Sequence, residues 1–203
     1  VTGVQTCALP ICPASAYADT FDINWHPVTP ELEHKVLLAV LEDQYGNELE
    51  RGAFTVTLVD GAAWLNYHGL RLPLAPETYA DLLRPAAAAL DGEPADDPQV
   101  QELHSILTAL DHLPPRVDST PEQVVERARE KEVVKRRLAA LLQASPGAAA
   151  AVEAALAELN GAAGHPDSFA ALDHLIDRQS YRLAFWRVSS EEINYRRFFD
   201  VDD

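Results

Sequence analysis

Methionine is absent from this chain of 203 residues, and cysteine occurs only as Cys7 and Cys12. Both lie in the first twelve residues, which resemble the conceptual translation of a sequencing-library adapter and lack the basic start and unbroken apolar run of a signal peptide. We therefore expect residues 1 to 12 to be a disordered artefact outside the fold. The remaining chain has no cysteine, which excludes a disulfide framework and a thiolate metal site and fits a reducing compartment.

Basic residues and long apolar runs are also scarce. The chain has 16 Lys and Arg against 32 Asp and Glu, a formal net charge of −16. This balance argues against nucleic acid or anionic lipid as a partner, because both need a basic surface. No run approaches the roughly 18 apolar residues that span a bilayer. The hydrophobic share of 47% is ordinary for a globular protein, so we expect an acidic globular protein with no nucleic-acid or membrane partner.

Residues 13 to 75 carry short strand patterns and predict a small β-containing domain. The apolar run Val36–Leu41 is bounded by charged residues, which fits a buried strand or a short helix. Residues 54–67 alternate on both sides of an Asp-Gly pair, which indicates a β-hairpin. Residues 69–74 suit a third strand.

From residue 76 to residue 178 the apolar period becomes helical. Apolar residues recur three to four positions apart in five segments, so each predicted helix has one face to bury. The third helix has the clearest start, because Thr120, Pro121 and Gln123 fit the N-cap, the first helical position and the third position of a capping box. We therefore expect an inserted helical subdomain, followed by a return segment at residues 179 to 203, and a fold that is mainly α with a small β portion.

Residues 21 to 27, Phe-Asp-Ile-Asn-Trp-His-Pro, place a carboxylate, an amide, an indole and an imidazole close together. Sugar sites favour this chemistry, since carboxylates and amides pair with hydroxyl groups and an indole packs on the apolar face of a pyranose. The same pattern suits a loop packed by Phe21 and Trp25 in which Asp22 and Asn24 satisfy backbone groups. Spacing alone favours the packed loop.

Aromatic residues and arginines interleave densely in the last stretch, at residues 181–187 (Tyr-Arg-Leu-Ala-Phe-Trp-Arg) and 194–200 (Asn-Tyr-Arg-Arg-Phe-Phe-Asp). Rings mixed with guanidinium groups suit a surface that recognises flat or hydroxyl-rich ligands. They also suit a core edge where arginines pair with carboxylates. The chain stops soon afterwards, at Asp203, and we expect the natural protein to continue.

Six segments, in the same order along the chain, resemble malto-oligosyltrehalose synthase, a family of the α-amylase superfamily. The last of them is the most specific, whereas residues 80 to 175 are similar to that family in character only. The resemblance identifies the chain as an internal fragment of such an enzyme. The segments are residues 21–27, 35–38, 43–46, 67–74, 181–187 and 192–200.

The resemblance implies that this chain is the segment inserted between the third and fourth strands of a (β/α)8 barrel, an excursion from the barrel. The barrel itself is not included in the chain. It implies a cytoplasmic isomerase of trehalose biosynthesis, a (1→4)-α-D-glucan 1-α-D-glucosylmutase. Such an enzyme converts the reducing-end α-1,4 bond of a malto-oligosaccharide into an α,α-1,1 bond by intramolecular transglucosylation. The implied route is retaining, as in glycoside hydrolases, and uses no metal and no organic cofactor.

By the same resemblance the catalytic carboxylates lie outside this chain, so no catalytic residue is assigned and the fragment is expected to be inactive alone. The missing flanking sequence would supply the rest of the barrel. Packing is the expected role of Phe185, Phe198 and Phe199. Ten residues are implied to line the sugar site or to support it: Asp22, Trp25, His26, Tyr181, Arg182, Trp186, Arg187, Asn194, Tyr195 and Arg196.

Two other functions remain open from the sequence. One is a non-catalytic, acidic helical module that docks protein partners through its apolar faces or its aromatic and arginine-rich end. The other is a fragment of an ordinary α-amylase-type hydrolase. No metal site is expected, because His104 and His112 are too far apart for paired ligands on one helix and the His165–His174 segment suits surface or capping roles.

Overall fold

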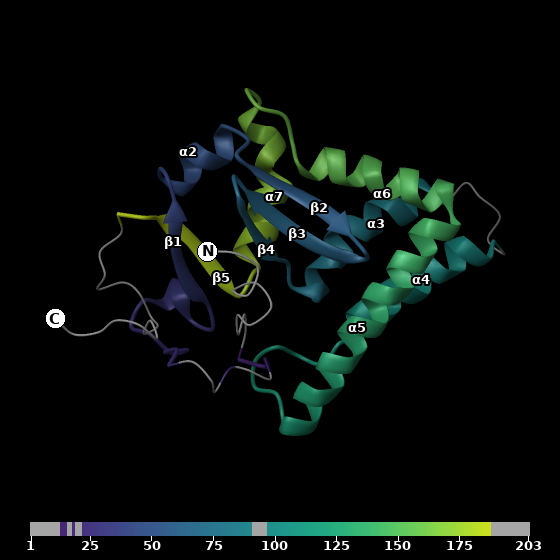
Figure 1. Ribbon diagram of the computed structural model, residues 1–203, viewed down its shortest axis with the longest axis horizontal. Helices are drawn as coiled ribbons and strands as arrows, with labels where there is room; N and C mark the ends of the chain where they lie inside the picture. Colours follow the sequence, from purple (N-terminus) through teal and green to yellow (C-terminus); the bar gives the residue numbers. More distant parts are fainter. Residues whose placement is uncertain (1–12, 16–17, 19–21, 91–96, 188–203) are drawn as a thin grey trace. The chain divides into compact units, whose positions relative to one another are not determined.

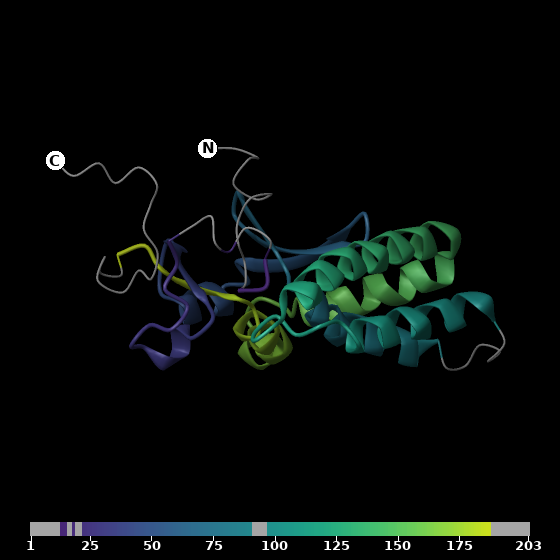
Figure 2. The same cartoon turned by 90° about the horizontal axis from the view of Figure 1, so that it is seen from below.

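The structure, a computed structural model, describes residues 13–15, 18, 22–90 and 97–187 (Figures 1 and 2). These residues form a mixture of α-helix and β-strand, which agrees with the predicted α+β class. They belong to two compact units. Of the described residues, the first unit contains those up to Glu48, Pro114–Ala128 and those from Gln179 onward, and the second contains those within Leu49–Leu113 and Arg129–Arg178. The predicted division into domains at residues 75 and 178, and the place of the chain in a barrel, stay predictions.

The first unit is built on two parallel strands, β1 (Val36–Leu41) and β5 (Tyr181–Phe185), which lie side by side in Figure 1. Their register runs from Val36 opposite Tyr181 to Leu38 opposite Leu183, with a shift between Ala39 and Leu41. Of the two conformations that the apolar run at 36–41 allowed, the strand is therefore the one adopted. The partner strand β5 was not predicted from the sequence.

Two short elements flank β1. The 3-10 helix η2 (Pro30–Leu32) precedes it, and helix α2 (Tyr45–Glu50) follows it. Asp43 starts the turn into α2, because its carboxylate accepts hydrogen bonds from the Gln44 backbone N–H at 2.8 Å and from the Asn47 side chain at 3.1 Å. The sequence did not predict α2, whose six residues are too short to show a helical period.

The second unit contains an antiparallel three-stranded sheet, β2 (Phe54–Val59), β3 (Ala62–Tyr67) and β4 (Leu70–Pro73). The predicted hairpin and the third strand are both confirmed. Phe54 and Val56 are buried while Thr55 and Thr57 are exposed, which is the alternation expected of a strand with one buried face.

In the described part of the chain five α-helices follow the sheet, as the apolar period predicted: α3 (Tyr79–Ala89), α4 (Pro98–Asp111), α5 (Pro121–Ala144), α6 (Pro146–Leu159) and α7 (Ala170–Asp177). Short 3-10 turns precede α3 (η3, Pro76–Thr78) and α7 (η4, Pro166–Phe169). Helix α5 begins in the first unit and continues into the second. Within the second unit α3 packs against α4 and α6.

Side chains at the helix starts provide the expected caps. The capping box of α5 is present, since the Thr120 N–H donates to the Gln123 side chain at 2.9 Å and the Gln123 N–H donates to the Thr120 hydroxyl at 3.4 Å. Asp97 caps α4, and the Ser145 hydroxyl accepts the Ala148 N–H at the start of α6. Each cap satisfies backbone N–H groups that have no partner inside the helix.

Polar side chains connect the elements of the second unit. The Asn160 amide, at the end of α6, pairs with both the N–H and the carbonyl of Val56 on β2. Arg137 on α5 donates to both carboxylate oxygens of Glu102 on α4, and this hydrogen bond lowers the pKa of Glu102. On α5 the Glu132 carboxylate binds Lys135 at 2.9 Å, and the Arg136 side chain donates to the Glu132 backbone carbonyl at 3.3 Å.

No single described helix is long and apolar enough to cross a membrane. Helices α5 and α6 meet that requirement only together, by length and composition, and they are bent by 112° at the break between them.

The turn between β2 and β3 provides a test of packing in the second unit. Gly61 has a φ of +72°, and a Cβ at this position would lie 1.9 Å from the Lys135 carbonyl oxygen on α5. We expect Gly61→Ala to lower the free energy of unfolding by about 2–4 kcal/mol, because the backbone is strained for alanine and the obstacle is backbone. The measurement is urea unfolding followed by circular dichroism.

The matched control is Gly69→Ala in the next turn, where a Cβ would meet nothing within 4 Å. This variant should stay within about 0.5 kcal/mol of the parent. Equal losses in the two variants would contradict the close approach of the β2–β3 turn to α5.

Candidate functional site

The carboxyl ends of β1 and β5 meet at one edge of the first unit, because the strands are parallel. The Trp186 N–H donates to the Leu41 carbonyl at 2.9 Å and extends the ladder by one residue. The residues that follow Leu41 are Glu42 and Asp43, so two carboxylates and an indole come from adjacent strand ends.

An aromatic and guanidinium cluster occupies this edge. The Trp186 side chain is 57% exposed, and the Arg187 guanidinium carbon lies 4.9 Å from the centre of its ring. The Phe185 ring contacts Trp186 edge-on, with 6.0 Å between the ring centres. We refer to Phe185, Trp186 and Arg187 as the Trp186 surface. An exposed indole with a guanidinium group over its ring can stack on a flat apolar face while the guanidinium pairs with hydroxyl groups around it.

The first residues of β5 alternate between the two faces of the strand. Tyr181 and Leu183 are buried, whereas Arg182 is exposed. The Tyr181 hydroxyl is buried and has no hydrogen-bond partner among the described residues, and burial raises the pKa of this phenol. Tyr181 and Arg182 are both predicted site residues, and of these two only Arg182 is accessible to a ligand in solution.

Trp25 and His26 lie at the other end of the ladder. The Trp25 carbonyl accepts the His34 N–H at 2.9 Å, and His34 comes just before β1. The six residues of β1 span about 17 Å at about 3.3 Å per residue. Figure 1 shows the segment that contains η2 at the start of the β1 arrow and the end of β5 near its head. The structure therefore does not bring Trp25 and His26 together with Trp186.

Asp22 and His26 are exposed and Trp25 is half-buried. Arg187 contacts the ring of its sequence neighbour Trp186 and is part of the Trp186 surface. The other three predicted site residues, Asn194, Tyr195 and Arg196, lie outside the described residues.

A cluster that the sequence did not predict surrounds His26. The Glu33 Oε1 atom lies 3.9 Å from His26 Nδ1 and 3.7 Å from His34 Nε2. The two imidazole rings meet edge to face, with 4.9 Å between their centres and 84° between their planes. Among the described residues this is the group of His, Cys, Asp and Glu side chains that could hold a metal ion. No regular spacing signals it, because a turn through η2 brings the residues together.

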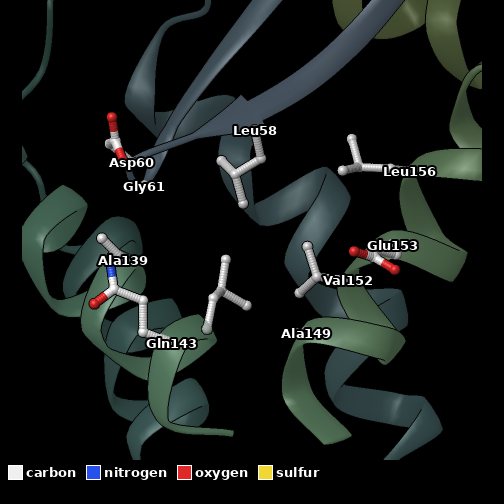
Figure 3. A pocket seen from close by; sticks show the side chains of 10 residues that line it. Leu58, Asp60, Gly61, Ala139, Gln143, Ala149, Val152, Glu153 and Leu156 are labelled. Carbon is white, nitrogen blue, oxygen red and sulfur yellow. The ribbon is translucent and has the colours of Figure 1, made fainter. Parts of the chain in front are cut away.

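The second unit has an open pocket of about 300 Å³ between the β2–β3 turn, α5 and α6 (Figure 3). Its lining is mostly apolar, and Asp60 and Glu153 lie on opposite sides of it in Figure 3. Without ionisable groups that converge on one point, the pocket has no arrangement for acid–base chemistry. The lining residues are Leu58, Asp60, Gly61, Ala139, Leu142, Gln143, Ala149, Val152, Glu153 and Leu156.

Comparison of the chain with protein-family models, with curated protein sequences and with solved structures gives no match.

Two buried tyrosines allow a matched test of the site geometry. The Tyr79 hydroxyl accepts the Ala63 N–H at 3.0 Å, whereas no group in the described part of the chain bonds the Tyr181 hydroxyl. We expect Tyr79→Phe to lower the free energy of unfolding by about 1–2 kcal/mol, since the substitution leaves a buried N–H unpaired. Tyr181→Phe should leave stability unchanged or raise it by up to about 1 kcal/mol. Thermal unfolding of both variants at pH 7 makes the comparison, and a larger loss in Tyr181→Phe would show that its hydroxyl has a partner.

Alkaline pH gives a second test of these phenols. Burial raises the pKa of Tyr79 to about 12. Between pH 10 and pH 12 the phenol therefore loses its proton in the unfolded state, where its pKa is about 10, but keeps it in the folded state. The free energy of unfolding is unaffected by this group below about pH 10 and falls by about 1.4 kcal/mol per pH unit as the pH rises towards 12. We expect the melting temperature to fall over this range, and to fall less steeply in Tyr79→Phe. An identical slope in that variant would contradict the assignment.

Proposed function

We propose that the chain is part of a cytoplasmic (1→4)-α-D-glucan 1-α-D-glucosylmutase, similar to malto-oligosyltrehalose synthase, and that its Trp186 surface contacts the malto-oligosaccharide. One observation carries this proposal. The exposed Trp186 and Arg187 extend a parallel strand pair at its carboxyl end, beside the chain that continues from β1 into Glu42 and Asp43.

The position is the reason to connect this surface with a ligand. In (β/α)8 barrels and open α/β sheets, ligands bind at the carboxyl ends of parallel strands. An antiparallel pair gives no such preference, because each edge then holds the amino end of one strand and the carboxyl end of the other. The parallel register of β1 and β5 thus supports a site at the edge that holds Trp186.

The chemistry of the surface suits a glucan. The apolar face of a glucose ring packs on an exposed indole, and the hydroxyl groups at its rim pair with guanidinium donors and carboxylate acceptors. Arg187, held over the indole, contributes donors whose position is restricted before the ligand arrives. The surface is therefore suited to binding and orienting a sugar, and we assign it no catalytic step.

In the proposed reaction an enzyme carboxylate attacks the anomeric carbon while a carboxylic acid protonates the leaving oxygen. The released glucose then attacks the glycosyl intermediate through its own anomeric hydroxyl, which displaces the carboxylate and returns the proton. This chain would hold the sugar, and the carboxylates would come from the rest of the enzyme. On this account the chain alone forms no trehalose unit from maltopentaose.

A docking module for proteins is the second candidate, and the apolar pocket of the second unit favours it. Leu58, Leu142 and Leu156 are half-buried and line an open, mostly apolar pocket between the sheet and two helices. Such a module would have no affinity for maltopentaose, which separates the two candidates.

An ordinary α-amylase-type hydrolase is distinguished by its products. The full-length enzyme would then release reducing sugars and form no α,α-1,1 bond.

The test of the proposal is binding of maltopentaose to the chain by isothermal titration calorimetry. We expect Trp186→Ala to raise the dissociation constant by about tenfold. The substitution removes one aromatic stacking contact, which contributes about 0.5–1.5 kcal/mol in addition to the burial of apolar area. Trp64→Ala is the matched control, because the Arg71 guanidinium carbon lies 4.3 Å from the Trp64 ring centre in the second unit. This second tryptophan–arginine pair should leave affinity unchanged.

Equal losses in the two variants, or no heat of binding in the parent chain, would contradict the proposed function. Formation of trehalose units by the chain alone would instead show that it contains the catalytic carboxylates.

A further inference from the structure

We propose that His26, Glu33 and His34 form a binding site for a divalent transition-metal ion, with Zn²⁺ as the ion that fits best. The site lies at the amino end of β1, apart from the Trp186 surface, and does not depend on the proposed function.

The loop from Trp25 to His34 brings the three side chains together. The His34 N–H closes the loop by donating to the Trp25 carbonyl at 2.9 Å, and the Glu33 N–H donates to the Pro30 carbonyl at 3.1 Å. Leu32, which precedes Glu33 in this loop, is only 4% exposed and anchors the turn. The loop thus fixes the backbone on both sides of the cluster before any ion binds.

The spacing of the donor atoms suits a small ion. The candidate ligand atoms all lie within 4.8 Å of one another, and Glu33 Oε1 is 3.9 Å and 3.7 Å from the nearest nitrogens of His26 and His34. Tetrahedral Zn²⁺ holds its ligands roughly 3.3 Å apart, because each lies about 2.0–2.1 Å from the ion. The two Glu33 distances need to shorten by about 0.5 Å, and the separation of the two imidazole nitrogens, at most 4.8 Å, by up to about 1.5 Å. We expect rotation of the exposed His26 and Glu33 side chains to bring the three ligand atoms to these distances when the ion binds.

The donor set identifies the class of ion. Two imidazoles and one carboxylate suit Zn²⁺ and its neighbours, whereas Ca²⁺ and Mg²⁺ prefer oxygen ligands alone. Three protein ligands leave a fourth position open, and the side chains of His26 and Glu33 are 74% and 59% exposed, so solvent reaches that position. The formal charge of −16 also favours cations near the chain.

Two features of His34 shape the site. Its φ of +58° lies in the left-handed region, which glycine adopts most readily. Its Nδ1 atom is buried, and within the described ranges it has no hydrogen-bond partner. A metal-bound histidine usually donates its second N–H to an acceptor, and loss of such a bond weakens affinity by about 10–100-fold. We therefore expect an exchangeable ion and not a permanent structural one.

The test is titration of Zn²⁺ against a chromophoric chelator, using the full chain with Cys7→Ser and Cys12→Ser so that thiolates do not compete. Three variants remove one ligand each: His26→Ala, Glu33→Gln and His34→Gly. Glycine suits the backbone at position 34, so the loop keeps its conformation when the imidazole is removed. His104→Ala, at an exposed histidine on α4, is the matched control.

We expect one Zn²⁺ per chain, at least about 30-fold weaker binding in His26→Ala and His34→Gly, about tenfold weaker binding in Glu33→Gln, and no change in His104→Ala. Zn²⁺ should raise the melting temperature of the parent but not of His34→Gly, since only a ligand that binds the folded state stabilises it. Binding that survives His34→Gly, that falls equally in His104→Ala, or that is absent from the parent would overturn the proposal.

Discussion

The parallel pairing of β1 with β5 is the constraint on which the rest of the structure depends. A parallel pair cannot be closed by a tight turn, so the chain between Leu41 and Tyr181 has to leave the first strand and return beside it in the same direction. That requirement explains why the first unit is assembled from separate stretches of sequence. It also explains why the sheet of the second unit and most of the helices lie between the two strands in the sequence.

The same pairing gives the first unit two chemically different ends. Its carboxyl end holds Trp186 and Arg187 next to the exit of β1, where guanidinium donors and an exposed ring favour a hydroxyl-rich ligand. Its amino end holds His26, Glu33 and His34, where imidazole and carboxylate donors favour a metal ion. The length of β1 separates the two groups, so one ligand of the size of a single glucose unit cannot contact both.

Local patterns in the sequence predicted what depends on neighbours along the chain. The stripe of apolar residues gave the helices, the alternation around Asp60 and Gly61 gave the hairpin, and Thr120 with Gln123 gave the capping box. Strand β5 was missed because Arg182 and Trp186 read as ligand-binding residues, and its strand character comes from a partner far away in the sequence. The grouping of His26 with Glu33 and His34 was missed for a similar reason, since it depends on the Trp25–His34 hydrogen bond.

The candidate sugar site was predicted only in part. Trp186 and Arg187 are together and exposed, as the interleaved pattern indicated, but Tyr181 faces the core because neighbouring residues of a strand point to opposite faces. Trp25 and His26 lie at the opposite end of the ladder, which sequence order cannot reveal without the direction of the strand that connects the two motifs.

The most direct measurement of the central claim uses the fact that the chain has three tryptophans. With Trp25→Phe and Trp64→Phe, fluorescence reports on Trp186 alone, and a second chain with Trp64→Phe and Trp186→Phe reports on Trp25. If the carboxyl end of the β1–β5 ladder binds malto-oligosaccharide, maltopentaose will change the emission of the Trp186 chain saturably and leave the Trp25 chain unchanged. A saturable change in the Trp25 chain alone would place the sugar at the opposite end of the ladder and contradict the account.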